Sequence, residues 1–177
     1  MQGKAVRDSF LPSFLTPLRT LARRQNSLVC VARVSRPGPI ASSHCVVKAL
    51  MPPFRDAESQ SFTNEYLRLH ALRHPNWVSP PLFGRSPSAA LFLALEQEHG
   101  VLLSDLPRLP WGPALLRICH GILSALHALH STGHAHLDLK PEQVLVPRTE
   151  NLTADSEVDV CVLDLGLSAG VGTPIEV

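Results

Sequence analysis

The feature that most constrains the fold is an apolar repeat between residues 113 and 131. Apolar side chains recur there every three or four residues, at Leu115, Ile118, Ile122, Leu126 and Leu129. This spacing places them on one face and predicts an amphipathic helix. Pro113 favours the first helical turn and Gly133 favours the exit. The sequence therefore predicts one long helix over residues 113–131.

Short β-type segments come before and after that helix. Residues 28–34 and 43–50 are apolar and β-branched and are separated by a Pro/Gly-rich turn, which predicts a hairpin. Residues 59–74 have apolar side chains at helical spacing, with Pro75 beyond the end, which predicts a second helix. Further strands are expected in the stretches WVSPPLF, AALFLALEQE, QVLV and VDVCVLDLG. This order of elements predicts an α+β fold in two lobes.

Charge is distributed unevenly along the chain. Residues 1–55 contain nine Lys or Arg and one acid, whereas residues 56–177 contain seven Lys or Arg and fourteen acids. A basic arm for nucleic acid is one explanation, but no aromatic residues interleave the bases, so nucleic-acid binding is not expected. A basic lobe facing an acidic lobe across a cleft is simpler, and it would suit an anionic ligand with a metal ion.

Neither a membrane span nor a disulfide framework is expected. The chain has no run of eighteen apolar residues, and its four cysteines are far apart with no CxxC pair. These features favour a reducing compartment, cytoplasmic or nuclear. The basic N-terminus leaves mitochondrial targeting as the alternative.

The stretch HAHLDLKPEQVLV at residues 134–146 concentrates reactive side chains. Four of them fall within eight positions, at His136, Asp138, Lys140 and Gln143. A metal site is one alternative, because four histidines crowd together at His127, His130, His134 and His136. However, Gly133 interrupts the helix there, and no Cys or carboxylate cluster completes a tetrahedral set.

Together with other segments, this stretch resembles the serine/threonine protein kinases of eukaryotic type. HLDLKPEQVLV resembles the catalytic loop HRDLKPENILL, and DLG at residues 164–166 resembles DFG. VVKAL around Lys48 resembles the VAIK strand, Glu65 falls where the next helix carries the partner of that lysine, and HPNWV resembles HPNIV. FLALEQE resembles the approach to the hinge, with Leu95 at the gatekeeper position. The six matches follow the order of the family over about residues 21–174.

The resemblance implies a bilobal kinase-like fold that binds ATP. A poorly ordered extension would cover residues 1–20, an N-lobe with the hinge residues 21–98, and an incomplete C-lobe residues 99–177. Lys48 would contact the ATP phosphates and Glu65 would hold it as an ion pair. The catalytic residues would be Asp138, which orients the hydroxyl of a protein substrate, and Lys140, which neutralises the γ-phosphate. The other residues implied are Asp164 and Gln143 for Mg²⁺, and Ala22, Val29, Leu95 and Glu96 around the nucleotide.

Four departures from the family pattern bear on activity. Ala22, Arg24 and Ser27 replace the three glycines that let the backbone approach phosphates, and Arg24 is expected to prop that loop open. Gln143 replaces an asparagine, and its extra methylene displaces the oxygen by about 1.5 Å, which weakens one Mg²⁺ contact. Leu137 replaces the arginine of HRD. The segment after DLG is short and the sequence ends without an APE motif, so a fragment or a pseudokinase that acts as a binding or scaffold module is the alternative.

Simpler explanations remain open for the single residues. Lys48 could be a solvated lysine on an edge strand, Glu65 could face water, and Asp164 could only begin a turn. Because the helical half of a kinase C-lobe is not in this sequence, the long helix is expected to leave Leu116, Leu123 or their neighbours exposed.

Overall fold

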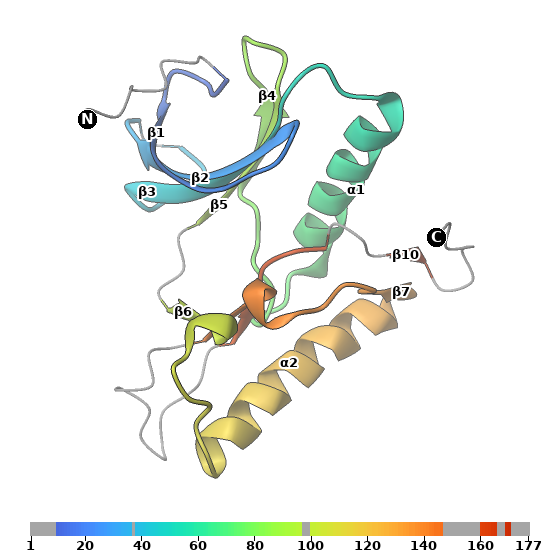
Figure 1. Ribbon diagram of the computed structural model, residues 1–177. Coiled ribbons are helices and arrows are strands. Elements are labelled where there is room, and N and C mark those ends of the chain that lie inside the picture. Colours follow the sequence, from blue (N-terminus) through green and yellow to red (C-terminus); the bar gives the residue numbers. More distant parts are fainter. Residues whose placement is uncertain (1–9, 37, 97–99, 147–159, 166–168, 171–177) are drawn as a thin grey trace. The chain divides into compact units, whose positions relative to one another are not determined.

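The computed structural model describes residues 10–36, 38–96, 100–146, 160–165 and 169–170 (Figure 1). It has the predicted α+β composition, with two α-helices and three sheets among these residues. None of the helices in the described part is both long and apolar enough to cross a membrane. The chain divides into two compact units: unit 1 comprises residues 1–66 and 80–97, and unit 2 comprises residues 67–79 and 98–177.

Unit 1 is built on a five-stranded antiparallel sheet. Its strands are β1 (Leu15–Arg23), β2 (Ser27–Val34), β3 (His44–Leu50), β4 (Leu82–Arg85) and β5 (Leu91–Glu96), in the spatial order β1-β2-β3-β5-β4 (Figure 1). The hairpin predicted from residues 28–34 and 43–50 is confirmed, with Cys30 opposite Val47. The prediction of a strand over WVSPPLF is wrong for the first five of these residues, because β4 begins at Leu82. The two consecutive prolines before it cannot donate hydrogen bonds to a sheet.

One face of this sheet forms the core of unit 1. Alternate side chains of β2 and β3 are buried there, at Cys30, Ala32, Cys45, Val47 and Ala49, because successive side chains of a strand point to opposite faces. Phe10, Leu11 and Leu15 join the same cluster. Residues 10–20 are therefore not a poorly ordered extension, which corrects the expectation for residues 1–20. The edge strand β1 is hard to recognise because its apolar residues do not alternate with polar ones and because it contains Pro17.

α1 (Asp56–Leu72) begins three residues before the predicted start at residue 59. The Glu58 carboxylate accepts the backbone N–H of Arg55 at 2.7 Å. This contact favours the earlier start, because the first N–H groups of a helix lack intrahelical partners and its N-terminus favours negative charge. Within unit 1, Tyr66 of α1 stacks on Phe83 of β4 with ring centroids 4.6 Å apart.

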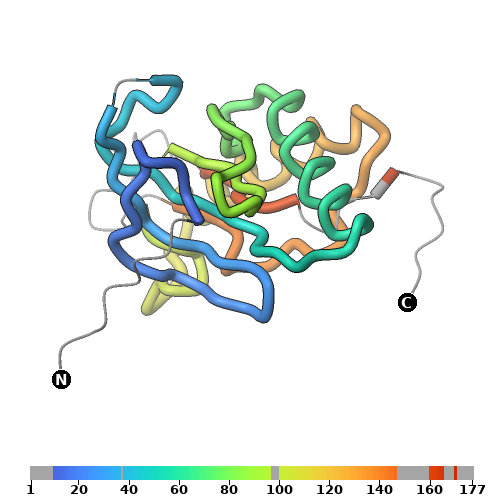
Figure 2. The backbone as a smooth tube through the Cα atoms, turned by 90° about the horizontal axis from the view of Figure 1, so that it is seen from above, coloured from blue at the N-terminus to red at the C-terminus, as the bar shows by residue number. Residues whose placement is uncertain are grey.

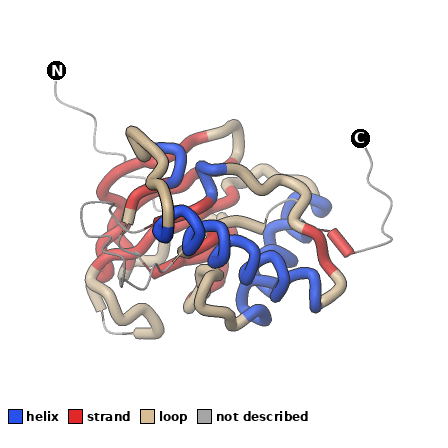
Figure 3. The backbone as a smooth tube through the Cα atoms, turned by 90° about the horizontal axis from the view of Figure 1, so that it is seen from below, coloured by secondary structure: helices blue, strands red, loops and turns tan. Residues whose placement is uncertain are grey.

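Unit 2 contains α2 (Pro113–Ser131), which has the bounds that the sequence predicts. Gly133 adopts φ +76°, and its N–H donates to the carbonyl of His130 at 2.9 Å, so the helix ends in a left-handed turn that favours glycine. The smaller elements are β6 (Val101–Leu102), η1 (Leu103–Asp105), β7 (His134–Ala135), η2 (Pro141–Gln143), β8 (Val144–Val146), β9 (Cys161–Val162) and β10 (Ala169–Gly170). β6, β8 and β9 form one sheet, and β7 pairs with β10. Figure 3 shows helices in blue and strands in red.

The two faces of α2 have different surroundings. The buried face contributes to a cluster of Ile118, Val144, Val146 and Val160. A Cβ atom on Gly121 would lie 2.8 Å from the Val160 Cβ, so the close approach at this position requires glycine. The opposite face leaves Leu116 and Leu123 70% and 64% exposed, as expected from the width of the apolar stripe.

Candidate functional site

Lys48 and Glu65 form an ion pair within unit 1. The Lys48 Nζ lies 2.6 Å from Oε1 and 2.8 Å from Oε2 of Glu65, so the ammonium donates to both carboxylate oxygens. Glu65 is only 4% exposed, and Lys48 lies on β3, an interior strand of the sheet. Both simpler explanations are therefore wrong, because Lys48 is not on an edge strand and Glu65 does not face water.

Three other residues predicted to bind the nucleotide share a sheet face with Lys48. Directly opposed residues of neighbouring strands share a face, and Ala22 pairs with Val29, which pairs with Lys48. Leu95 pairs with Val46, two residues from Lys48, and so lies on this face as well. The sheet thus brings four predicted residues together on the side opposite the core of unit 1.

Glu96 lies on the other face of the sheet. It pairs with Cys45, whose side chain belongs to the core cluster. The Glu96 Oε1 accepts the backbone N–H of Ala41 at 2.9 Å. The carboxylate therefore supports the connection between β2 and β3, and the sheet does not bring it together with Lys48.

The segment predicted to cover the nucleotide is a tight hairpin between β1 and β2. The Arg24 N–H donates to the Ser27 carbonyl at 2.9 Å, and Arg23 pairs with Leu28 directly before the turn. The Arg24 side chain is exposed. Arg24 therefore does not prop the hairpin open, because the backbone ladder continues to the turn.

In unit 2, the two predicted catalytic residues are in contact. The Lys140 Nζ lies 3.0 Å from the Asp138 Oδ2, and both side chains are partly exposed. The Asp138 N–H donates to the His136 Nδ1 at 3.3 Å. Leu137 between them has φ +64°, in the left-handed region that L-residues rarely adopt. This turn and the His136 contact fix the backbone that presents the Asp138 carboxylate.

Gln143 connects this loop to the segment after β9. Its Oε1 accepts the Lys140 N–H at 3.2 Å, and its Nε2 donates to the Asp164 Oδ2 at 3.4 Å. The Gln143 carbonyl also accepts the Leu163 N–H at 2.9 Å. The two predicted metal ligands therefore lie side by side, and Asp164 does more than begin a turn. The predicted glycine of the same motif, Gly166, lies outside the described residues.

Trp77 supports this loop, and sequence reasoning misses it. Its Nε1 donates to the Ala125 carbonyl at 2.8 Å, and its ring stacks on His136 with centroids 5.9 Å apart. Burial lowers the pKa of the His136 imidazole below its usual range, although the Asp164 and Asp138 carboxylates oppose this effect. The available signal was the tryptophan in HPNWV, whose large ring needs a partner surface.

Comparisons with known proteins identify relatives of one kind. The chain is 36% identical to the serine/threonine-protein kinase pkn3 of Myxococcus xanthus over 111 residues, which cover 60% of the chain and 19% of that protein. It is 32% identical to the serine/threonine-protein kinase D2 of Homo sapiens over 124 residues, 67% of the chain and 13% of that protein. It is 30% identical to the mitogen-activated protein kinase hog1 of Aspergillus clavatus over 165 residues, 89% of the chain and 40% of that protein. No protein-family model matches the chain.

The chain spans less than half the length of these three relatives. The similarity nevertheless covers most of the chain, up to 89% of it. These serine/threonine-protein kinases match 60–89% of the chain at 30–36% identity and support its relation to a kinase-like family.

Proposed function

We propose that the chain is the part of a serine/threonine protein kinase that binds ATP and transfers its γ-phosphoryl group to a protein hydroxyl. The observation that supports this function best is the Lys48–Glu65 ion pair, which holds an ammonium on the sheet face shared by Ala22, Val29 and Leu95. Phosphoryl transfer requires mainly positioning and charge neutralisation. The two-lobed arrangement expected from the sequence stays a prediction.

Each polar residue has a distinct role in the proposed transfer. Lys48 binds the α- and β-phosphates, and Glu65 fixes the position of its ammonium. The substrate hydroxyl oxygen forms a bond to the γ-phosphorus as the bond from that phosphorus to the β,γ-bridging oxygen breaks, and the hydroxyl proton passes to the Asp138 carboxylate. Lys140, 3.0 Å from Asp138, neutralises charge on the transferred group.

The residues of unit 2 fit a magnesium ion in part. Asp164 offers the carboxylate oxygens that Mg²⁺ prefers, whereas Gln143 turns its nitrogen toward Asp164 and its oxygen toward the Lys140 N–H. We therefore assign Asp164 as the residue that would hold the ion. Magnesium would supply neutralisation of the phosphate charge, and Gln143 would orient Asp164 through its N–H group.

Transfer of radiolabelled phosphate from ATP to a serine-containing peptide tests this function. We expect measurable transfer by the wild-type chain and its loss in Asp138→Asn, which keeps the size of the side chain and removes the base. Equal transfer by both chains would show that Asp138 is not the catalytic residue. Absence of phosphate transfer by both chains, when both are folded, would reject catalysis by this chain.

A binding module of the pseudokinase type is the second candidate. The glycine-free hairpin supports it, because β1 and β2 pair up to the turn and leave no flexible backbone to follow the phosphates. The orientation of the Gln143 amide supports it too. A thermal shift with ATP and Mg²⁺ in the absence of any phosphate transfer is the result that this candidate predicts.

A further inference from the structure

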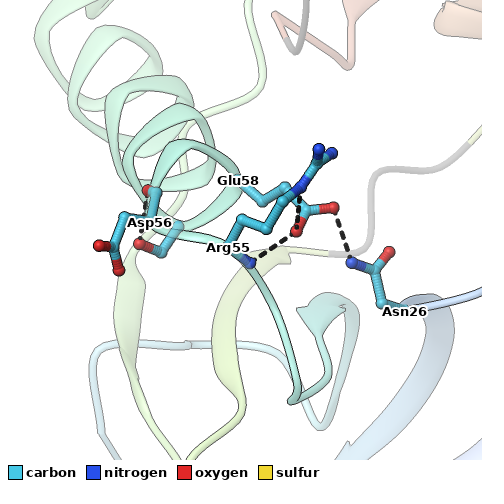
Figure 4. Close-up of polar contacts among 5 residues, drawn as sticks. Asn26, Arg55, Asp56 and Glu58 are labelled. Carbon is cyan, nitrogen blue, oxygen red and sulfur yellow. Dashed lines mark hydrogen bonds and ion pairs between the residues drawn. The ribbon is translucent and has the colours of Figure 1, made fainter.

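The turn of the β1–β2 hairpin is attached to the elements that follow β3. Asn26, which is half-buried in this turn, donates from Nδ2 to the Glu58 Oε1 at 2.9 Å. The Asn26 carbonyl accepts the N–H of Met51 at 2.6 Å. Figure 4 shows Asn26 and Arg55 on either side of the Glu58 carboxylate, and Figure 2 traces the hairpin in blue. Both side-chain and backbone atoms of one residue therefore hold the turn.

Glu58 uses each of its oxygens for a different element. Oε1 accepts from Asn26, while Oε2 accepts the Arg55 N–H at 2.7 Å and lies 3.5 Å from the Arg55 Nε. These hydrogen bonds, that of the Arg55 N–H above all, lower the pKa of the Glu58 carboxyl, so it is ionised at neutral pH. A single carboxylate thus caps the start of α1 and binds the hairpin.

Glu58 and Glu65 lie on the same side of α1. They are seven residues apart, which is nearly two helical turns and about 10 Å along the axis. Glu65 binds Lys48 on β3 and Glu58 binds Asn26 between β1 and β2. The helix therefore contacts the sheet at two polar points, one at the ammonium expected to bind phosphates and the other at the hairpin expected to cover them.

We propose that Asn26 is a positioning residue that couples the β1–β2 hairpin to α1, so that the hairpin and the Lys48–Glu65 pair hold or lose their positions together. The inference rests on the proposed function for its role in nucleotide binding. The coupling compensates for the absent glycines: a hairpin that cannot mould itself around phosphates is held in one position by the same helix that positions Lys48.

Amide hydrogen exchange measures the attachment without any ligand. In Asn26→Ala we expect the amides of Arg24 and Met51 to exchange about 5-fold faster, which corresponds to one net hydrogen bond. Gln25→Ala, an exposed neighbour in the same turn, is the matched control and should leave these rates unchanged. Asn26→Asp opposes two carboxylates and should also accelerate exchange. Asn26→Asp combined with Glu58→Gln reverses the hydrogen bond and should restore slow exchange.

Rescue by this exchanged pair distinguishes a specific contact from general loss of stability. If Asn26→Ala exchanges as slowly as the wild type, or if the exchanged pair is as fast as Asn26→Asp alone, the inference is wrong. Coupling is tested with Lys48→Met, which should accelerate exchange in the hairpin of the wild type but add nothing in an Asn26→Ala background. Additive accelerations would also overturn it.

Measurements with ATP distinguish a failure of this inference from a failure of the proposed function. ATP with Mg²⁺ should slow amide exchange in the wild-type hairpin. The affinity of Asn26→Ala for ATP should be about 5-fold lower than that of the wild type. If ATP has no effect on any variant while the pattern of exchange rates holds, the coupling stands and nucleotide binding is rejected. If ATP binds equally to wild type and Asn26→Ala, the positioning role is rejected and nucleotide binding stands.

Discussion

Replacing Lys48 with Met removes the ammonium that donates to both oxygens of Glu65 and keeps a long unbranched side chain. Glu65 is 4% exposed, so its carboxylate loses an interaction that compensates for burial. Removing one partner of a fully buried ion pair costs about 3–5 kcal/mol. Because the Lys48 side chain is 24% exposed, solvent screening reduces this cost. We expect the free energy of unfolding to fall by about 2 kcal/mol.

A double-mutant cycle measured by urea unfolding checks this value. Glu65→Gln removes the other charge, and the combined Lys48→Met/Glu65→Gln variant removes both charges of this ion pair. We expect the free energy of unfolding of the double variant to exceed, by about 1–2 kcal/mol, the value that adding the two single effects would give. Arg33→Met, an exposed cation on β2, is the control and should change stability by less than about 0.5 kcal/mol. A neutral Lys48→Met, or strictly additive effects, would refute the assigned ion pair.

Three further predictions follow from burial and packing. Burial lowers the pKa of His136, so the unfolded chain binds a proton at this residue more readily than the folded chain does. The free energy of unfolding should therefore decrease as the pH falls below about 6.5. Urea titrations at pH 7.5 and 5.5 that show no such decrease, or the same decrease in His136→Phe, would contradict this prediction. Gly121→Ala should lower the free energy of unfolding by about 1–3 kcal/mol, because its Cβ would lie 2.8 Å from that of Val160; an unchanged melting temperature would reject this packing. Iodoacetamide at pH 8 should label the exposed Cys119 within the folded chain and label Cys30 only after unfolding, because burial raises the pKa of Cys30 to about 11; mass spectrometry of the peptides reads out the order.

The elements that the sequence predicts well are those defined by local patterns. The period of α2 and the glycine after it fix both ends of that helix. The apolar, β-branched residues at 28–34 and 43–50, with the Pro/Gly-rich turn between them, predict the β2–β3 hairpin. Lys48 and Glu65 were paired through the family resemblance, since they are seventeen positions apart and the residues between them carry no local signal that would join them.

The features that the sequence does not reveal depend on contacts between distant segments. β1 is exposed along most of its length, has no alternating apolar pattern and becomes a strand because β2 provides its hydrogen-bond partners. Trp77 lies near His136 only in the folded chain. Gln143 and Asp164 were both implied as Mg²⁺ ligands by the resemblance, but the orientation of the Gln143 amide depends on the Lys140 N–H. Backbone geometry, which side-chain patterns do not encode, decides that contact.

The proposed function requires that Lys48, held by Glu65, binds the phosphates of ATP. Calorimetric titration of the folded chain and of Lys48→Met with ATP and Mg²⁺, with adenosine as the phosphate-free control, measures this directly. We expect ATP to bind the wild type at least about tenfold more tightly than Lys48→Met, a difference of about 1.4 kcal/mol, and adenosine to bind both equally. Equal affinity of the two chains for ATP would contradict the assignment.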